Sequence, residues 1–142
     1  KEDVEALQKG LADDIMDVIA TDHAPHAARE KEQGIQKAPF GIVGLETAAA
    51  LTYTELVKPG ILTPMQMAEK MSYNPAKILG LDKGTVEAGS PADLTIFDPE
   101  CEWVIDPAEF LSKGKNTPFG GKKVTGKVMA TIVDGEIAYQ EK

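Results

Sequence analysis

The sequence predicts an α/β chain in two parts, a helix–strand–helix part over residues 1–80 and an all-β part over residues 81–142. Before Gly80, apolar residues recur mostly at helical spacing, around one short apolar run that is typical of a buried strand. After Gly80, turn residues separate short segments rich in β-branched residues. A single strand of a parallel sheet needs neighbours. We therefore expect the first part to be one β/α unit whose partner strands come from elsewhere.

The first part begins with an expected amphipathic helix over residues 3–16, followed by a buried strand over residues 18–21. Residues 22–41 show no periodicity, and long structureless loops in compact domains are often functional. An alanine-rich helix is expected over residues 44–58. The apolar positions that predict the first helix are Val4, Leu7, Leu11 and Ile15.

Capping residues mark the last helix of this part. Thr63 is the expected N-cap, with Pro64 at the first helical position and Gln66 completing a capping box. This helix should extend to about residue 72, and a short helical turn over residues 74–79 should end at a glycine.

The second part is predicted to be all β. Strands are expected at residues 94–97 and 102–105, and the clearest hairpin spans residues 128–139. Apolar and polar residues alternate there, and Asp134-Gly135 is typical of a two-residue type I′ turn.

Composition excludes several classes of function. The 142 residues carry a net charge of −8, which disfavours nucleic acid and anionic membrane surfaces as partners. Apolar runs stay well short of the roughly 20 residues of a membrane helix. Cys101 is the single cysteine, so we expect a reducing, cytoplasmic setting. The chain begins at Lys1 rather than a methionine and shows no signal peptide, so a processed product or a fragment is expected.

The segment Val18 to His26, VIATDHAPH, holds both histidines of the chain. It places Asp22 at the carboxyl end of the expected strand, which in a β/α barrel is the catalytic face. A carboxylate there can bind a metal or act as a general base, and His26 can bind an anionic group. Composition alone favours the reading in which Asp22 caps a turn on an ordinary solvated loop, because short Asp/His clusters are common.

The number of candidate ligands limits a metal site. Catalytic zinc takes three protein ligands, mostly histidine, and the chain has two histidines and one cysteine. Either the chain binds no catalytic metal, or the remaining ligands lie outside it.

Six blocks of sequence, beginning with IATDHAPH, resemble the dihydroorotases of the amidohydrolase superfamily. The octapeptide IATDHAPH at 19–26 resembles the family signature near the last barrel strand. PFG at 39–41 and GLET at 44–47 look like the loop and helix that follow. The other blocks are NPAKILGL at 74–81, GTVEAGSPADLTIFD at 84–98 and KNTPFGGKKVTGKVMATIVDGE at 115–136.

This resemblance implies a fold and an activity. Residues 1–80 would be the C-terminal end, the last β/α unit, of a metal-dependent hydrolase TIM barrel, and residues 81–142 would be strands of a small β-sandwich domain. The family interconverts N-carbamoyl-L-aspartate and L-dihydroorotate in pyrimidine biosynthesis and uses a binuclear zinc centre. The first-strand His-x-His and the metal-bridging lysine of the family are missing, so we expect this chain to be inactive by itself.

The resemblance also implies roles for four residues. Asp22 would contact a zinc ion and carry the proton from the attacking hydroxide to the leaving ring nitrogen. His26 would bind the substrate carboxylate, and Phe40 and Gly41 would contact the substrate through the loop backbone. His23 has no role in the family, and we expect it to be hydrogen-bonded to backbone.

Three alternatives remain at this point. Allantoinases and hydantoinases are related cyclic amidases, although His26 and the NTPF block favour dihydroorotase. A non-catalytic relative could instead be a scaffold for aspartate carbamoyltransferase, and an independent small binding module is a third reading. Without partner strands, the helices at 3–16 and 44–58 should expose apolar faces, so a homo-oligomer is expected. The expected ligand is a small molecule.

Overall fold

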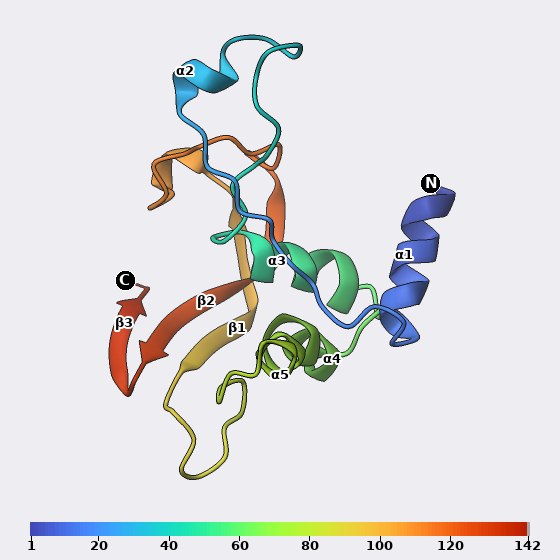
Figure 1. Cartoon of the computed structure of the whole chain (residues 1–142), viewed down its shortest axis with the longest axis vertical. Helices are drawn as coiled ribbons and strands as arrows, with labels where there is room; N and C mark the ends of the chain where they lie inside the picture. The colour runs from blue at the N-terminus through green and yellow to red at the C-terminus, as the bar shows by residue number, and fades with distance from the viewer. Residues whose placement is uncertain (142) are drawn as a thin grey trace.

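The computed structural model describes residues 1–141, in which short helices pack against a small antiparallel sheet (Figure 1). Helices α3 and η1 contact strand β2, whereas α1 lies apart at the N-terminal end. The helices are α1 (Glu2–Ala12), α2 (Ala28–Lys31), α3 (Ala48–Thr52), η1 (Tyr53–Val57), α4 (Pro64–Ala68), η2 (Glu69–Tyr73), α5 (Asn74–Leu79) and η3 (Pro107–Glu109). Each helix in the described part of the chain is too short or too polar to cross a membrane.

The first helix is shorter than predicted. α1 ends at Ala12 rather than at residue 16, because Asp14 adopts a positive φ of 56° and reverses the chain. The amides of Ile15 and Met16 both donate to the Gly10 carbonyl, at 2.9 and 3.1 Å, which closes the helix end. Ile15 is therefore 75% exposed instead of lying on the apolar face of the helix.

The buried strand predicted at residues 18–21 is not formed. These residues carry no strand assignment, and Ala20 is exposed while the other three are half-buried. The amide of Ile19 donates to the Lys70 carbonyl at 3.0 Å, so this segment is held by η2 and not by a sheet. A strand needs a neighbouring strand for its backbone groups, and the described residues supply none here.

The later helices follow the capping signals. Thr63 accepts from the Gln66 amide at 3.2 Å, and the Gln66 side chain accepts from the Thr63 amide at 2.9 Å, which confirms the capping box. The helical run then continues without a break through α4, η2 and α5 to Leu79, and Gly80 ends it with a φ of 66°. The helix predicted at 44–58 begins later, at Ala48, because residues 44–47 form a turn.

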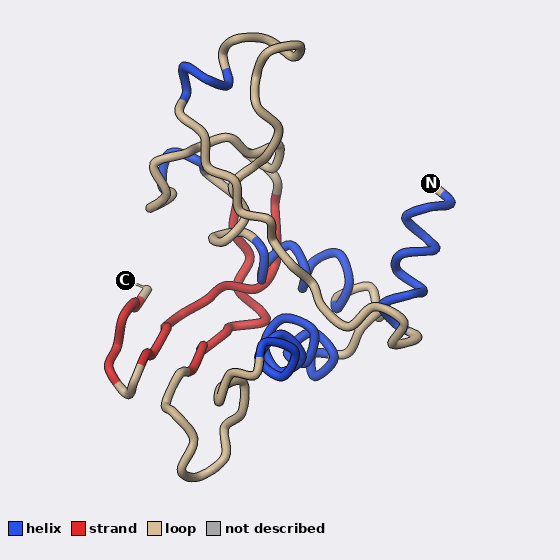
Figure 2. The backbone as a smooth tube through the Cα atoms, viewed as in Figure 1, coloured by secondary structure: helices blue, strands red, loops and turns tan. Residues whose placement is uncertain are grey.

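The second part forms one three-stranded antiparallel sheet with the order β1-β2-β3 (Figure 2). The two strands expected at 94–97 and 102–105 are one continuous strand, β1 (Leu94–Val104), with a register shift between Asp98 and Glu102. The predicted hairpin is confirmed by β2 (Lys123–Val133) and β3 (Glu136–Gln140), joined at Asp134-Gly135 with φ values of 50° and 81°.

The hydrophobic core joins the two parts of the chain. Its buried side chains come from α3 and the segment before it, from the segment between β1 and β2, and from β2. Trp103 packs against them. Because this one core includes residues from both parts, the division of the chain into two domains at residue 80 stays a proposal about the larger protein. The core residues are Val43, Ala50, Ile105, Phe110 and Val124.

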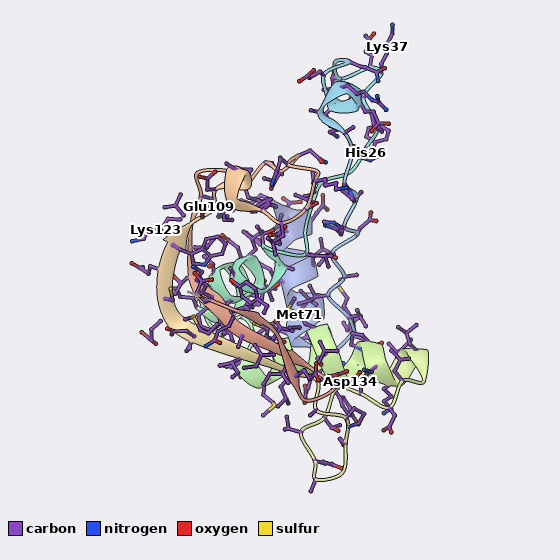
Figure 3. All side chains as sticks on the ribbon, turned by 90° about the vertical axis from the view of Figure 1, so that its left-hand side faces the viewer. His26, Lys37, Met71, Glu109, Lys123 and Asp134 are labelled. Carbon is purple, nitrogen blue, oxygen red and sulfur yellow. The ribbon has the colours of Figure 1, made fainter. Side chains whose placement is uncertain are left out.

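A loop projects from this packed body. Residues 24–42, which we call the projecting loop, leave the body, form α2 and return (Figures 1 and 2). In the side-chain view, His26 lies at the base of the loop and Lys37 near its tip (Figure 3). The expected exposure of apolar residues occurs on α1, where Val4 and Leu7 are each 55% exposed, but not over residues 44–58, where Ala50 and Val57 are buried. The homo-oligomer stays a prediction.

Candidate functional site

Asp22 lies where the extended segment 18–21 meets the projecting loop. It is exposed, and its φ of 45° is unusual for a residue with a side chain. Its carboxylate is therefore open to solvent. An accessible carboxylate held in an uncommon backbone conformation can accept a proton or bind a cation.

His23 holds the two ends of the projecting loop together. Its Nδ1 accepts from the Gly44 amide at 3.0 Å and from the Leu45 amide at 3.4 Å. His23 also forms a parallel bridge with Ile42, next to the 2.8 Å hydrogen bond from the Ala24 amide to the Ile42 carbonyl. The prediction that His23 is hydrogen-bonded to backbone is confirmed.

His26 lies beside the Phe40-Gly41 peptide, as a shared site requires. Its Nε2 is 2.9 Å from the Phe40 carbonyl oxygen, and because a carbonyl can only accept, Nε2 must carry the proton. The imidazole nitrogen Nδ1 then stays available for another partner. The structure therefore brings three of the four sequence-predicted residues into contact, with the Phe40 side chain 95% exposed.

Gly41 is required by the chain itself. Its φ is 122°, and a Cβ built there would lie 2.5 Å from the Ala24 Cβ and 3.3 Å from His26 Nε2. By resemblance, Gly41 was expected to contact the substrate through its backbone, which stays a prediction. The structure shows a close approach of the opposite limb of the loop, which any larger residue would push away.

Two side chains outside the predicted set of site residues secure the loop, and one of them, Lys31, was expected to be a solvated loop charge. Lys31 Nζ donates to the Pro39 carbonyl at 2.8 Å and to the Gly41 carbonyl at 3.1 Å. Asn116, from the second part of the chain, donates to the carbonyls of Ala24 and Gly41 and accepts from the His26 amide. Asn116 lies in the NTPF block, but no local pattern marks its partners, which are 75 to 92 residues away.

The described residues do not form a metal site by themselves. Within residues 1–141, no group of three or more His, Cys, Asp or Glu side chains could hold a metal ion. Nδ1 of His23 and Nε2 of His26 are engaged with backbone groups, so Asp22 is the accessible donor of the predicted set. One carboxylate does not fit zinc, which takes three or four protein ligands.

Two ion pairs beside the sheet shift the pKa values of their members. The hydrogen bond from Lys83 lowers the pKa of Asp93, assisted by the Asp134 amide, and the same contact raises the pKa of Lys83. The hydrogen bond from Lys123 lowers the pKa of Glu102. These ion pairs belong to the sheet and its flanking loop and have no place in the candidate site.

Comparisons with known proteins agree along almost the whole chain. A profile of the amidohydrolase family matches residues 1–138. The chain is 54% identical over 140 residues to a dihydroorotase of Pelotomaculum thermopropionicum and 56% identical over 141 residues to one of Bacillus cereus. Both matches cover 99% of this chain and 33% of the relative, so the chain spans about a third of the length of these curated relatives.

Solved structures share the fold at lower identity. An L-hydantoinase (dihydropyrimidinase) from Arthrobacter aurescens has a TM-score of 0.88 at 34% identity, covering 94% of this chain and 31% of that protein. A dihydropyrimidinase from Brevibacillus agri has a TM-score of 0.89 at 28% identity, covering 95% and 31%. The match of the family profile to nearly every residue decides the classification: the chain belongs to the amidohydrolase family and is a homologue of dihydroorotases.

Proposed function

We propose that this chain is the C-terminal part of a dihydroorotase, which interconverts N-carbamoyl-L-aspartate and L-dihydroorotate. The observation that carries the proposal is the 54–56% identity to curated dihydroorotases over 99% of the chain. The hydantoinase and dihydropyrimidinase structures, at 34% and 28% identity, support the wider class of cyclic amide hydrolysis. The alternative substrates are therefore hydantoins and dihydropyrimidines. Allantoin is a further alternative, which the sequence resemblance suggests.

In this proposal, residues 1–80 complete a β/α barrel and residues 81–142 belong to a β-sandwich. Barrel strands supplied by the rest of the protein would give the extended segment at 18–21 the strand partners that it lacks within residues 1–141. The exposed apolar residues of α1 would then be covered by neighbouring elements. Asp22 would lie at the carboxyl end of a barrel strand, where substrates bind in such folds.

The site residues divide between binding and proton transfer. His26, whose Nε2 contacts the Phe40 carbonyl, would bind the substrate carboxylate by donating from Nδ1 of an imidazolium, and the backbone of Phe40 and Gly41 would contact the substrate. By resemblance, Asp22 would be the catalytic residue and would also contact a zinc ion, and its carboxylate is exposed. Zinc remains part of the proposal for the whole protein, with its other ligands outside this chain.

The reaction needs one group that can move a proton. In ring opening, water adds to the amide carbonyl carbon, the bond from this carbon to the ring nitrogen breaks, and the nitrogen gains a proton. Asp22 would take the proton from the attacking water and give it to the nitrogen, which otherwise leaves poorly. Ring closure is the same path in reverse and releases the water.

The test is an assay of the full-length protein in both directions, with dihydroorotate, dihydrouracil, hydantoin and allantoin compared as ring-opening substrates. We expect a kcat/KM that is highest for dihydroorotate. Asp22→Asn should lower kcat by about 10²–10⁴-fold, the usual contribution of general acid–base catalysis. Asp17→Asn is the matched control, because Asp17 is also exposed and precedes the same segment.

Each other outcome has a definite meaning. A preference for hydantoin or dihydrouracil would mean that the full-length protein is a hydantoinase or a dihydropyrimidinase and not a dihydroorotase. The full-length protein would be a non-catalytic scaffold if it were inactive on all four compounds and co-sedimented with aspartate carbamoyltransferase. Equal losses in Asp22→Asn and Asp17→Asn would remove the catalytic role of Asp22.

A further inference from the structure

The proposed substrate-binding groups lie on two limbs of one loop. His26 is on the outgoing limb, and Phe40 and Gly41 are on the returning limb, 14 and 15 residues later in the sequence. The loop between them projects into solvent, so the body does not pack against its tip (Figure 3). The spacing of the limbs therefore depends on contacts at the base of the loop.

Asn116 makes contact with both limbs at that base. Its Oδ1 accepts from the His26 amide at 3.3 Å, and its Nδ2 donates to the Gly41 carbonyl at 3.0 Å and to the Ala24 carbonyl at 3.4 Å. Its own backbone carbonyl accepts from the Val43 amide at 2.9 Å. One residue thus binds backbone groups of both limbs, immediately beside the proposed site.

The chemistry of the amide side chain suits this arrangement. An asparagine has one oxygen that accepts and one nitrogen with two hydrogens to donate, which matches one amide and two carbonyls. An aspartate of the same shape could accept from His26 but would direct a charged oxygen at the carbonyls of Ala24 and Gly41. Alanine would leave all three backbone groups without these partners.

The segment that carries Asn116 is itself packed against the loop. A Cβ built on Gly114 would lie 2.9 Å from the Pro25 Cβ and 3.1 Å from Asn116 Oδ1, so the backbone at 114 approaches the outgoing limb closely. Gly114 is buried. This segment follows η3 and precedes β2, so the second part of the chain holds the binding loop of the first.

We propose that Asn116 is a positioning residue of the substrate-carboxylate site: it fixes the distance between His26 and the Phe40-Gly41 peptide. This inference rests on the proposed function for the identity of the substrate. Asn116 acts through the residues that it holds and does not take part in proton transfer. Its loss should therefore weaken substrate binding and leave the chemical step nearly intact.

Hydrogen exchange of the full-length protein tests the positioning directly, without reference to activity. In Asn116→Ala, peptides that span residues 22–44 should exchange about tenfold faster, because three hydrogen bonds at the base of the loop are lost. Peptides from β2 should keep their rates, which also shows that the variant is folded. Asn116→Asp preserves the volume and should accelerate the same loop peptides.

Thr54→Val is the matched control. The Thr54 hydroxyl likewise joins the two parts of the chain, donating to the Thr125 carbonyl at 3.1 Å and accepting from the Thr125 amide at 2.9 Å. Its loss should leave exchange in the loop peptides unchanged. Unchanged loop exchange in both Asn116 variants, or equal acceleration in Thr54→Val, would overturn the inference.

Steady-state kinetics supply the second readout. Asn116→Ala should raise KM for dihydroorotate about tenfold and leave kcat within about twofold of the wild type. A tenfold change in KM corresponds to the loss of one hydrogen bond to a charged group. A fall in kcat at unchanged KM would overturn the positioning role. Inactivity of the wild type overturns the proposed function instead, and the exchange rates distinguish that failure from this one.

Discussion

The packed body and the projecting loop of this chain are held by different forces. In the body, Ile105 and Val124 are each 1% exposed and lie in one apolar cluster with residues from both parts of the chain. In the loop, Ile35 is 96% exposed, and hydrogen bonds from His26 and Lys31 to backbone carbonyls join the two limbs. Burial thus stabilises the body, whereas polar contacts at the base determine the shape of the loop.

This difference indicates how substitutions should act in each region. Removing a buried apolar side chain costs free energy of unfolding for the whole chain, because the cavity remains in the core. Removing a hydrogen bond at the base of the loop changes a local equilibrium, because the loop can open while the body stays folded. The predictions below test that separation, beginning with the largest effect.

The largest effect is expected from Ile105→Ala in the body. The side chain is 1% exposed, so its truncation should lower the free energy of unfolding by about 2–5 kcal/mol. Val104→Ala, at the neighbouring position and 55% exposed, is the control and should stay within about 0.5 kcal/mol. Urea denaturation followed by circular dichroism measures both, and similar losses in the two variants would show that the core is placed wrongly.

The next effect is expected from Gly41→Ala in the loop. The new Cβ would lie 2.5 Å from the Ala24 Cβ at a φ of 122°, so the limbs must separate or the backbone must rearrange. We expect a local cost of about 1–3 kcal/mol, seen as faster hydrogen exchange in residues 22–44. The urea midpoint of the body should move less than in Ile105→Ala.

Gly34→Ala is the control for this substitution. Gly34 also has a positive φ, 81°, but an added Cβ there would meet nothing within 4 Å. It should therefore show the backbone cost without separating the limbs. Equal exchange rates in the two variants would mean that the close approach to Ala24 does not matter.

Local signals predicted the fold wherever the structure itself is local. The capping box at Thr63, the αL glycine at Gly80 and the turn at Asp134-Gly135 each involve groups a few residues apart, and all three are present. The strand at 18–21 failed for the opposite reason: a strand needs a partner that no local pattern provides. The extension of the first helix to Ile15 failed because the positive φ at Asp14 overrides apolar periodicity.

The candidate site follows the same rule. The hydrogen bond between His23 and backbone was expected, and the structure contains it. The resemblance assigned His26 and the Phe40-Gly41 peptide to one site, and the structure brings them into contact. Asn116 could not be found in this way, because its amide partner at His26 is 90 residues away in the sequence. The roles of the four site residues remain predictions for the experiments above.

A smaller local effect is expected from Lys31→Met. Lys31 Nζ donates to the carbonyls of Pro39 and Gly41, and the loss of these hydrogen bonds should loosen the returning limb by about 0.5–1.5 kcal/mol. Cleavage by thermolysin near Ile35 should then become faster. Lys37→Met, an exposed change near the loop tip, is the control, and faster cleavage in both variants would show that Lys31 does not hold the loop.

The smallest effect is expected in the body at low pH, from Asp93→Asn. The hydrogen bonds from Lys83 and from the Asp134 amide lower the pKa of Asp93 below its ordinary value of 3.8 in the folded chain. The unfolded chain therefore takes up this proton at a higher pH than the folded chain. The stabilisation is fully present above pH 3.8 and is lost as the pH falls through the lowered pKa.

In urea titrations from neutral to acid pH, the wild type should therefore lose stability more steeply than Asp93→Asn below the ordinary carboxyl pKa. The difference should be small and should shrink further in high salt, because the ion pair between Lys83 and Asp93 is at the surface. Asp82→Asn, an exposed neighbour of Lys83, should follow the wild-type curve. If all three curves coincide at low salt, this ion pair contributes nothing, and apolar burial alone stabilises the body at that edge of the sheet.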